Sequence, residues 1–284
     1  MRTIYKFTAI LFIILLSTVS AYTNPQNIVS LSPSITEIIY YVGAGTQLVG
    51  VTTYCNYPDE VMNLPKVGGY YGKTISMEAI VSLSPDLVIC EDKAHGMLSS
   101  QFEKLGIKAL YITNISLHTL EKNIMTIGEA TGHSEIAKEK AAEIKESLIR
   151  LQRICESFSS PNVYWEIWDD PIISAGPDSF IDEGLNYLHC INIFSDAKSE
   201  WPQVDDEIII LRNPDVVVIS NTRRGLISKD SIRKRPGWMN ITAVRNDRIY
   251  FVDEDIYSRP GPRLIAGMYE LAKSLYPSWK WEDE

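Results

Sequence analysis

The stretches EAIVSLSPDLVI, residues 78–89, and EIIILRNPDVVV, residues 207–218, are two copies of one short pattern. Each copy begins with a glutamate, continues with apolar positions at helical spacing, and reaches a Pro-Asp pair followed by three apolar residues. A Pro-Asp pair favours a turn, and a short apolar run after a turn is typical of a buried strand. Each copy therefore predicts a helix, a turn and a buried strand.

Further strands and helices are predicted on both sides of these copies. The other predicted strands are residues 27–31, 47–52, 108–112, 163–167 and 248–252, and further helices are predicted at residues 34–42 and 98–105. Strands separated by helical segments are typical of parallel sheets. The two copies thus indicate two α/β lobes of related build.

One long amphipathic segment, residues 134–157, separates the two halves of the chain. Its apolar residues approximate a single helical stripe, Ser134 is a plausible N-cap, and Pro161 ends the segment. We therefore expect two Rossmann-like lobes with parallel sheets, joined by one long helix, with a ligand cleft between them. The expected domains are residues 22–133, the helix 134–158, and residues 159–284.

The N-terminus predicts export. Arg2 and Lys6 precede an apolar run at residues 9–16, and the small residues Val19-Ser20-Ala21 follow. This order is typical of a secretory signal at residues 1–21, cleaved after Ala21. The alternative is an uncleaved anchor, for which the apolar run is short. The expected location is the periplasm or the extracellular face of a membrane, and no cysteine suitable for a lipid anchor stands at the cleavage site.

The net charge and the cysteines limit which partners and which metal or disulfide sites the chain can have. A formal net charge of −9 gives the chain no electrostatic reason to bind nucleic acid or an anionic membrane. The cysteines permit two disulfides, Cys55 with Cys90 and Cys155 with Cys190, or four free buried thiols. Their spacing does not predict a zinc site.

Sequence motifs of enzymes are missing. There is no G-x-S-x-G elbow and no phosphate-binding P-loop, and Gly43-Ala44-Gly45 follows a helix rather than a strand. The histidines are scattered, and only His95 stands just beyond a strand end. The sequence therefore predicts no catalytic residue and no metal site.

Aromatic residues instead gather beyond the predicted strand ends, where open α/β sheets bind ligands. They are Tyr54, Tyr57, Tyr70, Tyr71, Trp165, Trp168 and Tyr257, of which one of the two tryptophans is expected in the core. Such side chains offer broad apolar contact with a polar tip, which suits a large flat or bulky ligand. Arg259, in a loop stiffened by Pro260 and Pro262, could bind an amide, phosphate or carboxylate of that ligand or pair with surface acids.

Glu78 and Glu207 stand at equivalent places in the two copies. A carboxylate in the first turn of a helix is favoured by the helix dipole, so capping is one interpretation. The other is that one carboxylate per lobe meets two basic sites on a symmetric partner.

These residues resemble the cobalamin-type periplasmic binding proteins of ABC importers, a class that also carries haem and ferric siderophores. In the first half, the resemblance is carried by Ile28–Ser34, Thr36-Glu37, Val49–Val51, Tyr54, Tyr57-Pro58, Glu78, Pro85–Ile89 and Leu105–Ile107. In the second half, it is carried by Asn192–Phe194, Trp201–Val204, Glu207, Pro214 and Pro262-Arg263.

The resemblance implies a rigid helix between the lobes and docking of Glu78 and Glu207 onto arginines of a dimeric permease. Tyr54 and Tyr70 match positions that contact corrinoid in the cobalamin-binding members, and Ser34 is a further expected ligand contact. Where those members place a tryptophan after the third strand, this chain has Glu91, which is also an expected ligand contact. The aromatic pair expected near the last loop is Ile256-Tyr257 here.

We therefore expect a monomeric, non-enzymatic binding protein that holds cobalamin or a related corrinoid as cargo, with no resident cofactor. A ferric siderophore or haem carrier of the same importer class is the alternative. An enzyme on the same architecture would need an acid–base pair or metal cluster in the cleft. A sensor domain would lack the two carboxylates or carry an output segment.

Overall fold

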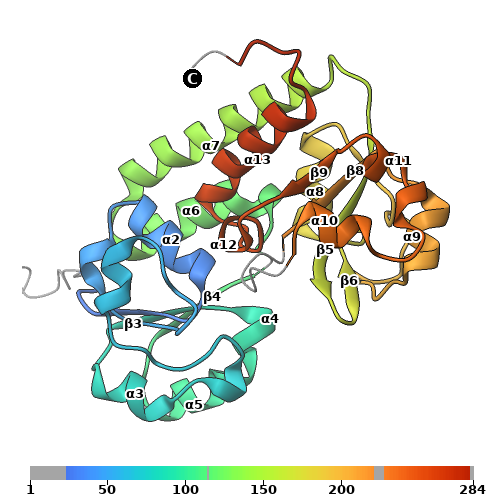
Figure 1. The fold of residues 1–284 in the computed structure, drawn as a ribbon. Coiled ribbons are helices and arrows are strands. Elements are labelled where there is room, and N and C mark those ends of the chain that lie inside the picture. The colour runs from blue at the N-terminus through green and yellow to red at the C-terminus, as the bar shows by residue number, and fades with distance from the viewer. Residues whose placement is uncertain (1–23, 114, 221–226, 282–284) are drawn as a thin grey trace, which may run out of the picture.

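The computed structural model describes residues 24–113, 115–220 and 227–281, which form two α/β lobes under a pair of long helices (Figure 1). The predicted signal peptide, residues 1–21, lies outside the described residues. Within the described ranges, no helix is long and apolar enough to cross a membrane.

The first lobe is built on a four-stranded parallel sheet in the order β2-β1-β3-β4. The strands are β1 (Ile28–Ser30), β2 (Leu48–Val51), β3 (Leu87–Glu91) and β4 (Ala109–Ile112). The helices are α2 (Pro33–Tyr41), α3 (Met77–Ser82), α4 (Asp92–His95), α5 (Ser99–Lys104) and α6 (Leu117–Thr131). Short 3₁₀ turns occupy Gly45–Gln47, Asp59–Asn63, Gly72–Thr74 and Gly96–Leu98. These strands lie where the sequence predicts them.

The second lobe contains a mixed sheet in the order β6-β5-β8-β9, with β7 also paired to β5. The strands are β5 (Asn162–Asp169), β6 (Ile172–Ser174), β7 (Ile191–Asn192), β8 (Val216–Ile219) and β9 (Ile249–Phe251). The helices are α8 (Phe180–Tyr187), α9 (Asp206–Arg212), α10 (Lys229–Arg233), α11 (Thr242–Arg245), α12 (Glu254–Tyr257) and α13 (Pro262–Leu275), with a 3₁₀ turn at Trp238–Asn240.

The prediction of purely parallel sheets was wrong for β6, which runs antiparallel to β5. Only Asp170 and Pro171 separate these two strands, and a connection that short can join only antiparallel neighbours. The pairs of β5 with β7 and β8, and of β8 with β9, are parallel.

The two sequence copies form the same structure in each lobe. The Asp86 carboxylate accepts the backbone N–H groups of Gln26 at 2.8 Å and Asn27 at 3.0 Å, just before β1. The Asp215 carboxylate accepts the N–H of Asn162 at 2.9 Å, at the start of β5. Each Pro-Asp turn thus connects the strand that follows it to the first strand of its lobe. The bonds from Gln26 and Asn27 hold the pKa of Asp86 below its usual value.

The helices that begin the two copies are capped in the same way. The Ser76 hydroxyl accepts the N–H of Ala79 at 3.2 Å at the start of α3, and the Asp205 carboxylate accepts the N–H of Ile208 at 3.0 Å at the start of α9. Such caps satisfy an N–H that has no partner within the helix. Glu78 and Glu207 therefore occupy the same exposed position in the first turn of each helix.

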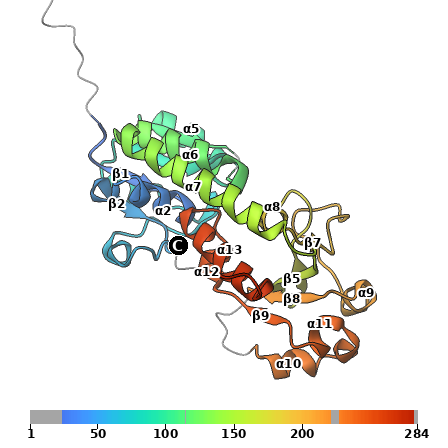
Figure 2. The same cartoon turned by 90° about the horizontal axis from the view of Figure 1, so that it is seen from above.

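The helix α7 (Ser134–Cys155) passes from one lobe to the other and packs against α6, α8 and α13 (Figures 1 and 2). Its buried stripe consists of Ala137, Ala141, Ile144, Leu148, Leu151 and Cys155. The C-terminal helix α13 lies beside α7 and also contacts α2 of the first lobe. Buried apolar residues of both lobes form one continuous cluster through these helices, so the lobes share a core.

All four cysteines are buried as free thiols, so the structure shows the second of the two expected arrangements and neither disulfide. The Cys55 thiol contacts the hydroxyls of Thr36 and Thr52 at 3.3 and 3.1 Å. Burial raises the pKa values of Cys90, Cys155 and Cys190 to about 12.

Candidate functional site

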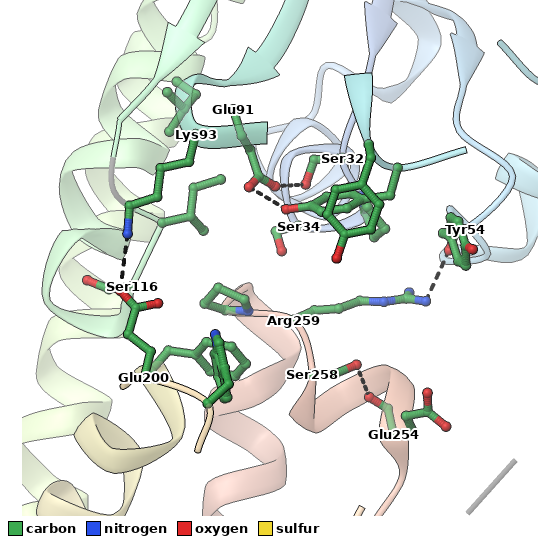
Figure 3. A pocket seen from close by; sticks show the side chains of 18 of the residues that line it. Ser32, Ser34, Tyr54, Glu91, Lys93, Ser116, Glu200, Glu254, Ser258 and Arg259 are labelled. Carbon is green, nitrogen blue, oxygen red and sulfur yellow. Dashed lines mark hydrogen bonds and ion pairs between the residues drawn. The ribbon is translucent and has the colours of Figure 1, made fainter. Parts of the chain in front are cut away.

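A cavity of about 450 Å³ lies between the two lobes (Figure 3). Its first-lobe wall follows the carboxyl ends of β1, β3 and β4, and its second-lobe wall includes the segments after β6 and β9. The carboxyl ends of the first sheet and of the parallel strand β9 thus face one space, which is where open α/β sheets bind ligands. Its volume is in the range of small-molecule sites.

A fixed carboxylate stands at the end of β3. Glu91 accepts hydrogen bonds from the hydroxyl of Ser32 and from that of Tyr70, the latter at 2.6 Å. Ser32 precedes α2, whose N-terminal end favours a nearby carboxylate. Burial and the nearby Glu91 carboxylate raise the pKa of Tyr70 well above its usual value, so this phenol remains a donor.

His95 lies behind Tyr70 and Glu91 rather than in the cavity. Its side chain is fully buried, its Nε2 is 2.6 Å from the carbonyl oxygen of Tyr70, and its Nδ1 is 3.1 Å from the backbone nitrogen of Glu91. The imidazole therefore fixes the backbone of the two residues that it joins.

Aromatic side chains from both lobes line the cavity. On the first lobe, Tyr54 and Tyr71 are 51% and 70% exposed, and the Tyr71 ring meets the Tyr70 ring edge-to-face at 5.2 Å. On the second lobe, the rings of Phe180 and Trp201 lie 5.5 Å apart. Exposed rings on two facing walls offer contact to both sides of a bulky ligand.

Arg259 lines the cavity but is held by groups of the protein itself. Its guanidinium donates to Asp255 at 2.6 Å, to the side chain of Asn56 at 2.6 Å and to the carbonyl of Tyr54 at 3.0 Å. Glu37 lies 3.5 Å away and also binds Arg263 at 2.6 Å. This cluster joins α2 and the segment after β2 to α12 and α13, so Arg259 fastens one lobe to the other.

A second contact between the lobes joins two residues that line the cavity. The Lys93 ammonium lies 3.2 Å from the Glu200 carboxylate, and both side chains are exposed (Figure 3). Exposed pairs contribute about 0–1 kcal/mol, so the loss of this contact should cost less than the removal of one partner from the buried cluster around Arg259.

The structure brings six of the sequence-predicted ligand residues together on the cavity wall. They are Ser34, Tyr54, Tyr70, Tyr71, Glu91 and Arg259. Four others lie elsewhere: Tyr57, Trp165, Trp168 and Tyr257.

Each of these four has a different environment. The Arg263 guanidinium lies over the Tyr57 ring, with its Cζ atom 4.0 Å from the ring centroid. Trp165 and Tyr257 are buried against each other, with ring centroids 5.7 Å apart. The Trp168 indole donates to the carbonyl of Asp170 at 2.8 Å, at the β5–β6 turn. Trp165 is the core member of the tryptophan pair.

The sequence did not single out several other polar and aromatic lining residues. They are Lys93, Ser116, Asp178, Phe180, Glu200, Glu254 and Ser258. Lys93, Ser116, Glu254 and Ser258 follow strands that the sequence predicted, and this position was the signal available. Asp178 and Phe180 follow β6, and Glu200 follows β7, two strands that the sequence did not predict. Among the described residues, no cluster of His, Cys, Asp or Glu could hold a metal ion.

Comparison with known proteins matches most of the chain to one protein family. Residues 28–256 match the family model described as periplasmic binding protein. An uncharacterized ABC transporter substrate-binding lipoprotein of Bacillus subtilis is 38% identical over 89% of this chain and 81% of its own length. A vitamin B12-binding protein of Vibrio campbellii is 30% identical over 87% of this chain and 88% of its own length.

A solved structure shows the same architecture. The periplasmic heme-binding protein of a Roseiflexus species superposes with a TM-score of 0.80 at 26% identity, over 89% of this chain and 98% of that one. The two-lobed arrangement of Figure 1 is therefore that of an established class of binding proteins.

Proposed function

We propose that this chain, which belongs to the periplasmic binding protein family, captures cobalamin or a related corrinoid and delivers it to a membrane ABC importer. The general role, a substrate-binding protein of ABC importers, is that of its family and relatives. The corrinoid ligand is the specific part of the proposal.

The observation that carries the proposal is the cavity with aromatic side chains on both walls. Tyr54 and Tyr71 on one wall, with Phe180 and Trp201 on the other, present apolar surface to both sides of a bulky, partly flat ligand. Hydroxyl and carboxylate groups between them, including Ser34 and Glu91, suit the peripheral amides of a corrinoid. Relatives at 25–30% identity that are named vitamin B12-binding proteins support the same class.

Haem or a ferric siderophore is the alternative ligand within the same role. The similarity to a heme-binding protein supports this alternative. A haem carrier would be expected to place an iron ligand in its cavity, but His95 is buried behind Tyr70 and Glu91. Tyr70 is bonded to Glu91, which leaves Tyr54 and Tyr71 as the exposed phenols on the cavity wall.

We further propose that the chain works as a monomer, performs no chemistry on its ligand and has no resident cofactor. The corrinoid would be cargo. Capture occurs outside the cytoplasmic membrane, as expected for relatives that are periplasmic or lipoprotein binding proteins.

Glu78 and Glu207 are the proposed contacts with the permease. They occupy equivalent positions on α3 and α9, one helix in each lobe, and both side chains are exposed. Two separated carboxylates of this kind suit a two-fold symmetric partner with one basic site per subunit.

Calorimetric titration of residues 22–284 with cyanocobalamin, haemin and a ferric hydroxamate siderophore tests the ligand. One-to-one binding of cyanocobalamin alone, with a dissociation constant of about a micromolar or less, is the expected result. A response to haemin or the siderophore without one to cyanocobalamin would contradict the corrinoid proposal and leave the importer role.

The docking proposal is tested separately with the E78A/E207A double variant. Ligand affinity should stay within about twofold, because neither side chain lines the cavity, whereas uptake by cells that carry the cognate permease should fall. The E146A/E156A variant, which removes two exposed carboxylates from α7 and its C-cap, is the matched control. Normal uptake with E78A/E207A would exclude the proposed contact.

A further inference from the structure

More acidic than basic side chains line the cavity. Among the described lining residues, the carboxylates are Glu91, Asp178, Glu200 and Glu254, and the basic side chains are Lys93 and Arg259. The wall therefore carries an excess of negative charge. A cavity lined by one sign of charge raises the local concentration of ligands of the opposite sign.

Neither basic side chain is well placed to bind an anionic ligand. Arg259 is 7% exposed and donates to Asp255, Asn56 and the Tyr54 carbonyl. Lys93 is paired with Glu200, and its side chain is 77% exposed. A phosphate or carboxylate on the ligand would have to displace one of these acids, and breaking the buried Arg259 pair is costly.

Among these carboxylates, Glu91 is held in place by hydrogen bonds to both of its oxygens. Donors from Ser32 and from Tyr70 bind its two carboxylate oxygens, and His95 fixes the backbone of Tyr70 from behind. A carboxylate oxygen has more than one lone-pair direction, so each oxygen can accept a further bond from a ligand in the cavity. A carboxylate fixed in this way loses little conformational entropy when a ligand binds.

We infer that the cavity selects positively charged corrinoids that lack the anionic nucleotide loop, in preference to neutral cobalamin and to haem. The inference rests on the proposed function, since it specifies which member of the proposed ligand class the same site binds best. A corrinoid without the nucleotide loop keeps its peripheral amides and the positive charge of the cobalt centre but loses the phosphodiester. Haem carries propionate carboxylates and has no compensating amide donors.

Three corrinoids separate charge from size. Aquocyanocobinamide is cationic, dicyanocobinamide has nearly the same shape but no net charge, and cyanocobalamin is neutral and carries the phosphate-bearing loop. Each is titrated into residues 22–284 at low and at high ionic strength. We expect aquocyanocobinamide to bind about 10-fold more tightly than either neutral corrinoid, and salt to reduce this ratio because it screens the wall charges.

Two variants that neutralise a cavity carboxylate, and one control variant, test whether the cavity wall causes the preference for the cationic corrinoid. E91Q keeps the size of the side chain and should reduce the ratio of cationic to neutral cobinamide affinity by about 10-fold. D178N is the second variant, because Asp178 is exposed and its φ of 64° is one that asparagine readily adopts; it should reduce the ratio by a smaller factor. E146Q changes an exposed carboxylate on α7 outside the cavity and should leave the ratio unchanged.

The outcomes distinguish this inference from the proposed function. Binding of all three corrinoids with equal affinity, or a ratio that neither E91Q nor D178N alters, would overturn the charge selection and leave the corrinoid function in place. Tighter binding of cyanocobalamin than of aquocyanocobinamide would do the same. Binding of haemin with no response to any corrinoid would overturn both.

Discussion

At the scale of single residues, exposure does not identify a ligand contact; position does. Trp168 and Trp201 are each 37% exposed. Trp201 lines the cavity opposite the tyrosines of the first lobe, whereas Trp168 lies at the β5–β6 turn. The two side chains therefore form a matched pair for mutation.

W201A is expected to weaken corrinoid binding by about 10-fold, since one aromatic contact contributes roughly 0.5–1.5 kcal/mol beyond its buried area. W168A should leave the affinity within about twofold. Both affinities are measured by calorimetry, with the thermal midpoint of each variant as a check on folding. Equal effects of the two substitutions would mean that this cavity is not the ligand site.

The buried thiols give a residue-scale prediction that depends on pH. Burial raises the pKa values of Cys90, Cys155 and Cys190 from 9.0 to about 12 in the folded state. The neutral thiol is therefore favoured by folding, and this contribution to stability is complete below pH 9 and is lost as the pH rises from about 9 towards 12.

Two measurements check this. At about pH 8 a thiol reagent should label the native protein slowly and the urea-unfolded protein rapidly at all four cysteines, because the thiolate is the reactive form. The free energy of unfolding should also fall between about pH 9 and pH 10.5. Rapid labelling of the folded chain would show that these side chains are accessible.

At the scale of elements, the approach of two helices depends on one glycine. A Cβ atom on Gly128 of α6 would lie 2.1 Å from the Cβ of Ala137 on α7. Real side chains do not approach so closely, so α6 and α7 would have to separate. A Cβ on Gly184 of α8 would meet its nearest neighbour, a Leu117 methyl group, at 3.7 Å, which is ordinary contact.

G128A is therefore expected to destabilise the protein by about 1–3 kcal/mol through overpacking. G184A should be neutral or stabilising by up to about 1 kcal/mol, because alanine is the better helix former. Urea unfolding of both variants measures the difference. If G128A were as stable as the parent, α6 and α7 could not pack as closely as the structure shows.

At the scale of the whole molecule, the lobes are joined by a shared core and by one buried ionic cluster. Glu37 is 3% exposed and lies between Arg259 and Arg263. Its partners come from the far end of the chain, so this cluster closes a connection that α7 alone does not make.

E37Q is expected to cost about 3 kcal/mol of unfolding free energy, because it leaves the buried Arg259 and the partly buried Arg263 with less compensating charge. It should also weaken ligand binding, since Arg259 lines the cavity. E135Q removes one member of an exposed pair with Lys138 and should cost under about 1 kcal/mol. Urea unfolding compares the two variants, and equal costs would show that the cluster does not stabilise the junction between the lobes.

The sequence alone indicated the two related lobes, the Pro-Asp turns, the long helix and six of the residues on the cavity wall. The lobes, the turns and the helix follow from local features, because helical spacing, turn residues and apolar runs report on burial within a few residues along the chain. The repeated Pro-Asp pair was informative because each aspartate binds the start of a neighbouring strand in the same way.

The tertiary structure decided what local patterns cannot encode. It placed Trp165 and Tyr257 in the core and added β6 antiparallel to β5. It also surrounded the Arg259 guanidinium with Asn56, Asp255 and Glu37. Whether a side chain faces a cavity, the core or an ion pair depends on partners that lie as far as 222 residues away along the chain. Only packing brings such partners together. The positions of residues along the sequence could therefore predict a ligand cleft with aromatic side chains, whereas the fold determined which residues line it and what charge they carry.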